Sequence, residues 1–421
     1  MASSHLSPAR QRAPGRLEQD DDAPRRWQML ALLALAELLG MSLWFAASAV
    51  SAQYQQQWSL SVSAAAWLTT AVQLGFVGGT ALAALLNLAD LVPARRLFAI
   101  AALLAAGCNA MVLSAPGLDT AILWRALTGV CLAGVYPPAM KMIATWFRAR
   151  RGMAVGTIVG ALTVGKALPY LVKAMPGASI ANVTLSASAG AVAAAAIVWL
   201  GYHDGPYAFP PRPFSWQLVR DVVNAPRWRL AMGGYLGHMW ELYAAWTWLP
   251  VFVAASVAAQ GLDGPTAGVR ASVVGFAALA VGGAGCLWGG LVADRRGRAW
   301  LVNVAMAVSG SCALLIGATF GRSLWLLAPI ALVWGFFVIA DSAQFSVMVT
   351  ESVPPHAVGT ALTLQTSLGF LLTAGVIQLV PLLEARVGWP WAFTMLAVGP
   401  VVGIASIRRL VATSVGSTGN S

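Results

Sequence analysis

Six ionisable side chains stand within long apolar stretches of the sequence, where a charge is costly unless it has a partner or a task. Three are acids and three are bases: Glu37, Glu241, Asp341, Arg125, Lys141 and Lys166. A carboxylate in such surroundings can take up or release a proton, and a guanidinium or ammonium group can bind an oxyanion. The six residues therefore predict that the chain binds an ion or moves protons inside its apolar part.

The two glutamates are the first candidates. Glu37 and Glu241 each lie near the middle of an apolar stretch, so we expect their carboxylates to face each other or a common substrate. His238 lies one turn before Glu241 on the same helical face. That pair is either a proton carrier or a structural hydrogen bond. Trp44 and Trp240, in the same two stretches, are candidates for the wall of a pocket that takes a bulky substrate.

The bases offer a second chemistry. Arg125 either binds an oxyanion and takes part in proton coupling, or forms a fixed salt bridge to a buried acid. Lys166 either attracts an anion or extends its charged end to the membrane surface. Lys141 and Asp341 are either an ion pair that closes a gate or two solvated helix ends. Gln365 is either a substrate contact or a contact between helices.

The composition places these residues in a membrane. The chain has 421 residues, of which 58% are hydrophobic and 10% charged, whereas soluble domains carry about 25% charged residues. Apolar stretches long enough to cross about 30 Å of hydrocarbon recur along the chain, and they lack the alternation of barrel strands. We expect an all-α membrane protein with twelve transmembrane helices, at about 29–50, 63–86, 96–114, 119–145, 152–173, 180–201, 229–256, 271–292, 299–319, 323–349, 356–380 and 390–411.

The helices are expected to form two pseudo-symmetric bundles of six. A proline-rich cytoplasmic linker at 202–228 divides a bundle at 27–201 from one at 229–411, and residues 1–26 and 412–421 are predicted to be cytoplasmic tails, the first of them disordered. Short motifs recur at matching places in the two halves. Ala154-Val155-Gly156-Thr157 returns as Ala357-Val358-Gly359-Thr360, and Met41 with Phe45-Ala46-Ala47 returns as Met239 with Tyr243-Ala244-Ala245. Related halves of this kind enclose a binding site near the midplane and rock around it.

The positive charge is an orientation signal. Most of the 26 Lys and Arg residues lie in loops on the side of the two termini, which predicts that both termini are cytoplasmic. We therefore do not interpret the net charge of +11 as nucleic-acid binding. The sequence shows no ATP motif, catalytic triad or metal cluster, so we expect no enzyme activity and no cofactor.

Several motifs resemble those of the major facilitator superfamily. Gly290-x-x-Ala293-Asp294-Arg295-x-Gly297-Arg298 is similar to the signature loop of that family, and its first-half copy keeps Asp90 but has Leu86, Leu91 and Pro93 at other positions. Arg125-x-x-x-Gly129 is similar to the family's motif in the fourth span. Trp146-Phe147, Arg151-Gly152, Ala154 and Gly156 resemble the start of the fifth span in the nitrate/nitrite and cyanate porters.

The resemblance implies a secondary transporter of the bacterial inner membrane that works by alternating access. Asp90, Gly290, Asp294, Arg295, Gly297 and Arg298 would then form the gating loops, with Asp294 and its arginines braced chiefly against the start of the eleventh span. We expect the transporter to be a monomer and its substrate to be a small inorganic or organic anion. Transport would be coupled to an ion, in symport or antiport, or would proceed by exchange with a counter-substrate. The alternative is proton-coupled efflux of drugs or other small molecules. A membrane-embedded enzyme or a receptor is a rival that the intact loop at Gly290–Arg298 argues against.

Overall fold

The structure is a computed structural model that describes residues 25–148, 150–207, 215–261 and 265–418. Nearly all of the predicted tail at 1–26, part of the predicted linker and residues 419–421 therefore lie outside the described residues. Within them, twelve helices are long and apolar enough to cross a membrane, which confirms the predicted all-α membrane fold.

The helices follow one another along the chain with short connections. They are α1 (Arg26–Gly40), α2 (Ala46–Ala49), α3 (Ser51–Trp58), α4 (Val62–Leu85), α5 (Leu88–Leu91), α6 (Ala94–Met111), α7 (Leu118–Leu132), α8 (Tyr136–Ala144), α9 (Arg151–Lys173), α10 (Ile180–Gly201), α11 (Trp216–Asn224), α12 (Pro226–Ala258), α13 (Pro265–Arg296), α14 (Arg298–Leu315), α15 (Leu324–Ala340), α16 (Ser342–Glu351), α17 (Val358–Val387), α18 (Trp389–Ala392) and α19 (Val398–Thr418). Short 3₁₀ segments lie at Met41–Leu43, Val112–Ser114, Ile316–Thr319, Pro355–Ala357 and Thr394–Ala397.

Local sequence sets where several helices begin. The hydroxyl groups of Ser61, Ser179 and Ser215 each accept a hydrogen bond from the backbone N–H three residues further along the chain. Each serine therefore caps the first turn of its helix. Gly297 separates α13 from α14 with φ of +87°, a conformation that favours glycine. The tight turn expected in this loop is therefore present.

Several predicted spans, including the first, fourth and tenth, are broken rather than continuous. The first span passes from α1 through a 3₁₀ turn at Met41–Leu43 to α2, the fourth divides into α7 and α8, and the tenth divides into α15 and α16. A break frees backbone carbonyl and N–H groups that must find other partners inside a membrane. Two of the six candidate ionisable residues are tied to such breaks: Arg125 donates to carbonyls at the first, and Asp341 stands between α15 and α16.

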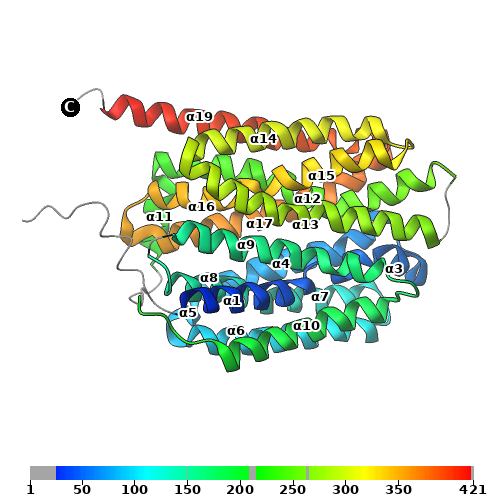
Figure 1. Ribbon diagram of the computed structural model, residues 1–421, viewed down its shortest axis with the longest axis horizontal. Helices are drawn as coiled ribbons and strands as arrows, with labels where there is room; N and C mark the ends of the chain where they lie inside the picture. The colour runs from blue at the N-terminus through cyan, green and yellow to red at the C-terminus, as the bar shows by residue number, and fades with distance from the viewer. Residues whose placement is uncertain (1–24, 149, 208–214, 262–264, 419–421) are drawn as a thin grey trace, which may run out of the picture.

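The two halves of the chain lie side by side (Figure 1), with α9 of the first half against α13 of the second and α4 against α17. The contact between α9 and α13 is very close, because a Cβ atom added at Gly160 would lie 3.1 Å from the carbonyl oxygen of Gly283. Across the other pair, the Gln378 amide donates to the Thr70 hydroxyl at 2.9 Å. The predicted linker contributes α11, which contacts α12 and α17.

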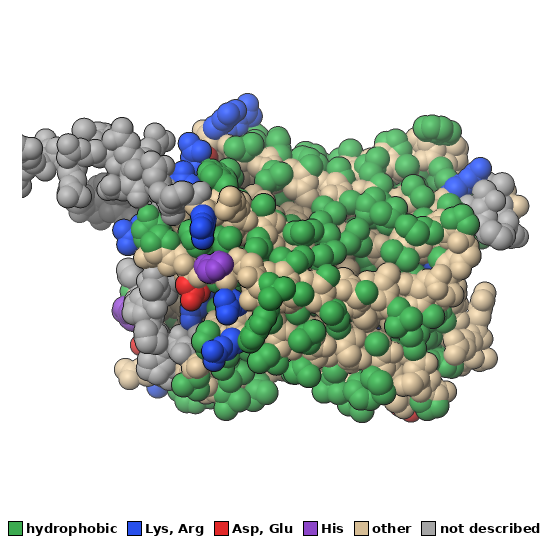
Figure 2. Space-filling view, turned by 60° about the horizontal axis from the view of Figure 1, so that its bottom comes forward, with side chains coloured by type: hydrophobic (Ala, Val, Ile, Leu, Met, Phe, Trp, Pro, Cys, Tyr) green, Lys and Arg blue, Asp and Glu red, His purple; other side chains and the backbone are tan. Residues whose placement is uncertain are grey.

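The outer surface has the distribution expected of a membrane protein. Figure 2 shows hydrophobic side chains over a broad middle zone and most of the visible Lys and Arg at one end of the molecule. Exposed apolar side chains such as Leu200 and Trp325 belong to this outer surface. Apolar side chains that contact lipid in a membrane require no protein partner.

Candidate functional site

A cavity lies between the two halves. Its free space is about 70 Å³, which holds a few water molecules but not a drug-sized ligand. Its walls are mainly aromatic and aliphatic side chains, together with one lysine and several hydroxyl groups: Met41, Trp44, Tyr136, Met140, Val155, Val159, Leu162, Lys166, Tyr235, Met239, Leu242, Tyr243, Trp246, Ile339, Ser342, Ala343, Ser346, Thr366 and Phe370. Among these lining residues Lys166 alone carries a formal charge.

Lys166 ends in an aromatic cage, which we define as Trp44, Tyr243 and Trp246. The Lys166 Nζ atom lies 4.3 Å from the ring centroid of Trp44, 4.7 Å from that of Tyr243 and 5.5 Å from that of Trp246. It also donates a hydrogen bond of 2.5 Å to the Tyr243 hydroxyl. Only 2% of the residue is exposed. The lysine therefore does not extend to the membrane surface, and its charge is stabilised by ring faces.

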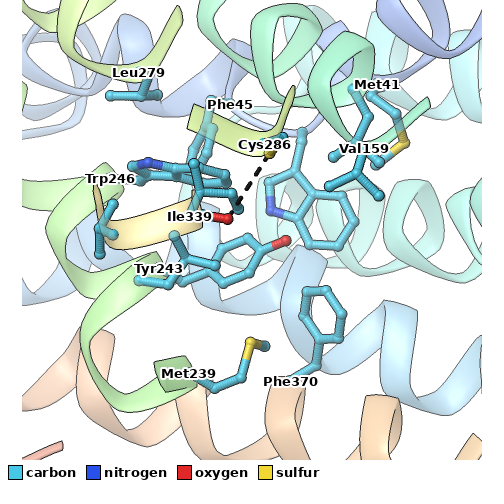
Figure 3. Packing of buried hydrophobic residues seen from close by; sticks show 14 of the residues in the cluster. Met41, Phe45, Val159, Met239, Tyr243, Trp246, Leu279, Cys286, Ile339 and Phe370 are labelled. Atoms are coloured by element: carbon cyan, nitrogen blue, oxygen red, sulfur yellow. Dashed lines mark hydrogen bonds between the residues drawn. The ribbon is translucent and has the colours of Figure 1, made fainter. Parts of the chain in front are cut away.

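A larger aromatic cluster connects the cage to both halves of the chain. Trp44 and Phe76 come from the first half, and Tyr243 and Phe370 from the second. Ring centroids lie 5.8 Å apart for Trp44 and Tyr243, 4.7 Å for Phe76 and Phe370, and 5.0 Å for Tyr243 and Phe370. Figure 3 shows Tyr243 between Trp246 and Phe370 in this packing. A substrate that enters the cavity must displace these rings.

Glu37 lies behind the cage in the first half. It is 0% exposed, and neither carboxylate oxygen has a hydrogen-bond partner among the described residues. Lys166 is the basic group that acts on it electrostatically. The two side chains are brought near each other because α9 packs tightly on α1, where a Cβ added at Gly165 would lie 2.1 Å from the Leu38 carbonyl oxygen.

Arg125 holds the break in the first span. Its guanidinium donates to the carbonyl oxygens of Leu68 at 3.0 Å, Leu43 at 3.0 Å and Trp44 at 2.6 Å, and to the Asn109 side-chain oxygen at 2.9 Å. The side chain is 0% exposed and does not line the cavity. These neutral acceptors correspond to neither sequence hypothesis, an oxyanion site or a salt bridge to an acid.

Glu241 is held within the second half. Its two carboxylate oxygens accept hydrogen bonds from the Ser309 hydroxyl at 2.7 Å and from the Trp334 indole N–H at 2.6 Å. These donors belong to α14 and α15, whereas Lys166 and Tyr136, the charged or titratable groups recorded near Glu37, belong to the first half. Neither glutamate lines the cavity. The expected facing arrangement of the two carboxylates is not formed in this conformation.

Two predicted pairings are replaced by a third. His238 Nδ1 lies 2.9 Å from Asp341 Oδ1, and both residues are buried. Asp341 Oδ1 and His238 Nε2 have no hydrogen-bond partner among the described residues. His238 thus pairs with Asp341 rather than with Glu241, because the break at Asp341 turns that carboxylate inward. Among the described residues Asp341 is therefore paired with His238 rather than with Lys141, and its burial shows that it is not a solvated helix end.

The two remaining candidates, Trp240 and Gln365, do not line the cavity, whereas Trp44 does. The Trp240 indole donates to the Met395 carbonyl at 3.0 Å and lies outside the cavity wall. Gln365 is buried, and its side-chain oxygen has no hydrogen-bond partner in the described part of the chain. It too lies outside the wall, to which its neighbours Thr366 and Phe370 contribute.

The loop at Gly290–Arg298 is bound to the tenth span. Arg298 Nη1 lies 2.6 Å from Glu351 Oε1 at the end of α16, and both side chains are partly exposed. Asp294 and Arg295 are exposed. Arg298 thus contacts the end of the tenth span, and the bracing of Asp294 against the start of the eleventh span stays a prediction. Asp90 lies in α5, and its side chain is outside the described structure.

Tyr243 is the residue of the site that sequence analysis missed as a chemical group. It occupies the position matched by Phe45 in the repeat, so the second half adds a hydroxyl where the first has none. That difference was visible in the sequence. The sequence could not show that this hydroxyl accepts a hydrogen bond from the Lys166 ammonium of the other half.

Comparisons with known proteins agree with this architecture. The chain matches the Major Facilitator Superfamily over residues 32–377, and it belongs to that family. Over 139 residues it is 33% identical to the uncharacterized transporter YgaY of Escherichia coli O157:H7, a match that covers 32% of this chain and 34% of that protein. Over 146 residues it is 32% identical to the puromycin resistance protein pur8 of Streptomyces alboniger, covering 34% of this chain and 28% of that protein. The matches thus span about a third of each relative's length.

Solved structures show the same fold over most of the chain. The nucleoside transporter NupG aligns with a TM-score of 0.69 at 14% identity, covering 91% of this chain and 99% of that one. A bacterial homologue of the human lysosomal transporter Spinster, in an inward-facing and unoccupied conformation, aligns with a TM-score of 0.63 at 16% identity, covering 93% and 96%. The chain is therefore a multi-pass membrane protein with a transporter fold.

Proposed function

We propose that the chain is a secondary active transporter that exchanges an organic molecule with an apolar or aromatic body for protons, by alternating access. The observation that carries this proposal is the cavity between the halves, whose walls are mostly aromatic and aliphatic. Such walls bind apolar surface, and a few polar groups orient it. The close contacts of α9 with α13 and of α4 with α17 provide surfaces about which the halves would rock.

Lys166 and Glu37 are the groups to which we assign proton coupling. Both are buried, and they have opposite charge and belong to adjacent helices. One of them lies on the cavity wall and the other behind it, so occupation of the cavity would change the surroundings of both. Ionisable groups placed in this way inside a membrane are the usual means of coupling a solute to a proton gradient.

We infer export as the direction and the bacterial inner membrane, with both termini cytoplasmic, as the location. Export is supported by the partial likeness to a protein named for puromycin resistance. The orientation is supported by the Lys and Arg side chains gathered at one end of the molecule (Figure 2), as the charge rule for membrane proteins requires.

A small anion or organic acid is the second candidate substrate. Lys166, a base, is the one charged residue among those that line the cavity. Two observations rank this candidate lower. The Lys166 ammonium already lies against ring faces, which repel anions, and Arg125 directs its donors to backbone and amide oxygens rather than to the cavity.

The test is transport by purified protein in proteoliposomes with an imposed pH gradient. We expect the gradient to drive movement of aromatic organic dyes, and a Lys166→Met variant to abolish the dependence on the gradient. Lys173→Met, at the end of the same helix and outside the cavity wall, is the matched control and is expected to transport normally. Gradient-driven movement of benzoate without movement of any neutral or cationic aromatic compound would establish the second candidate instead.

A further inference from the structure

We propose that the aromatic cage is the binding site for a positively charged group of the substrate, and that the Lys166 ammonium is a tethered occupant which an organic cation displaces. This inference rests on the proposed function and deepens it, because it names the substrate class and the group that exchanges the proton. Its basis is the arrangement of Lys166 between three rings contributed by both halves of the chain.

The cage has the geometry of a cation receptor. Two of its rings, Tyr243 and Trp246, come from α12 in the second half and Trp44 comes from the first. All three centroids lie within 6 Å of one ammonium nitrogen, which is the range over which ring faces attract cations. Organic ammonium groups are recognised in the same way in aromatic cages generally.

The surroundings of the cage define the substrate further. The indole N–H groups of Trp44 and Trp246 are buried and have no hydrogen-bond acceptor among the described residues. Met41, Leu162 and Phe370 extend the wall beyond the cage. Once the cage rings have moved apart to admit it, the site would suit an organic cation that carries an apolar body and an oxygen acceptor near its charge.

Two cations cannot occupy the cage together, because like charges at this distance repel strongly in a site closed to water. Binding of the substrate therefore requires that Lys166 lose its proton and become a neutral amine. The proton passes to the solution, so the protein releases one proton for each positive charge that enters the cage. The titratable groups recorded around Lys166 among the described residues are Glu37 on α1, Tyr136 on α8, and Tyr235 and Tyr243 on α12.

The exchange also explains how occupation of the site would bias the two conformations. While Lys166 of the first half donates to Tyr243 of the second, a charge-assisted hydrogen bond joins the halves. A bound cation breaks that bond and leaves the cage rings in contact with a mobile ligand. The substrate thus replaces the Lys166 ammonium, which is part of the chain, with a free cation that can leave on the other side of the membrane.

The experiment measures equilibrium binding to the purified full chain by tryptophan fluorescence. The probes are benzyltrimethylammonium, its neutral isostere neopentylbenzene and the anion benzoate. In the wild type we expect the cation to bind at least tenfold more tightly than the isostere or benzoate. In the pH range where Lys166 is protonated, the affinity of the protein for the cation should rise by up to about tenfold per pH unit, because binding releases one proton.

Two substitutions of Lys166 give opposite expectations. Lys166→Met empties the cage, so the cation should bind more tightly than in the wild type and without pH dependence. Lys166→Arg keeps a charge that cannot be removed, so cation binding should fall at least tenfold. Trp246→Leu should weaken the cation tenfold or more while leaving neopentylbenzene within about threefold. Lys173→Met is the matched control and should resemble the wild type.

Size-exclusion profiles and thermal unfolding identify any variant that does not fold, and the arginine variant then tests the inference if the methionine variant fails. Equal binding of the cation and its isostere, or an unchanged pH dependence in Lys166→Met, would overturn the inference. If a pH gradient drives transport of neutral aromatic compounds while cations are neither bound nor transported, the cage assignment is wrong although the proposed function holds.

Discussion

Replacing Arg125 by leucine is expected to destabilise the first half of the chain rather than to remove a substrate contact. The guanidinium makes four hydrogen bonds, three of them to carbonyl oxygens. Hydrogen bonds between helices in a membrane contribute about 0.6 kcal/mol on average and up to about 1.7, and bonds to charged groups about 1.5–3. Four bonds of this kind predict a loss of about 3–6 kcal/mol in the free energy of unfolding.

The assay is thermal unfolding of the purified protein in detergent, followed by intrinsic fluorescence. A loss of this size lowers the unfolding temperature by on the order of 10 °C. Arg125→Lys should be destabilised by a similar amount, because one ammonium group cannot reach acceptors on three helices. Arg270→Leu, which removes an exposed arginine, is the matched control and should unfold with the wild type. If Arg125→Leu unfolded at the wild-type temperature and lost only substrate binding, the guanidinium would act on the substrate and the structural account would be refuted.

Three other substitutions test separate parts of the account. Glu241→Gln exchanges one hydrogen-bond acceptor for a donor, so the free energy of unfolding should fall by about 1–3 kcal/mol while cation binding stays within a few-fold of the wild type; loss of binding at unchanged stability would contradict this. Gly165→Ala places a Cβ against the Leu38 carbonyl oxygen and should lower the unfolding temperature, whereas Gly107→Ala, where nothing lies within 4 Å, should leave it unchanged or raise it; equal effects would mean that α1 and α9 do not pack as described. Asp294→Asn should slow transport in proteoliposomes without changing the unfolding temperature or substrate affinity, and an unchanged rate would remove this residue from the gate.

The sequence predicted the number and position of the transmembrane helices because each span must supply a long apolar segment whatever its neighbours are. It also located the buried charges, since a charge stands out within such a segment. It did not predict the breaks in the first, fourth and tenth spans. The break in the first span depends on a donor from another helix, Arg125, which satisfies carbonyl groups that the break frees.

The pairing of the buried charges lay beyond the sequence for the same reason. Glu241 and His238 share a helical face, yet each finds its partner on another helix: Glu241 bonds to Ser309 and Trp334, and His238 lies beside Asp341. Helical periodicity gives the direction of a side chain relative to its own helix, but not the depth or rotation of the helix opposite. Lys166 was identified as a candidate, whereas its partners on α12 depend on how the two halves meet.

The central claim is that a cation in the aromatic cage takes the place of the proton on Lys166. The most direct test is to add benzyltrimethylammonium to the purified protein in weakly buffered solution, at a pH where binding depends on pH, and to measure released protons. The account predicts a release that approaches one proton per bound cation in the wild type and none in Lys166→Met. Cation binding without proton release in the wild type, or the same release in Lys166→Met, would contradict it.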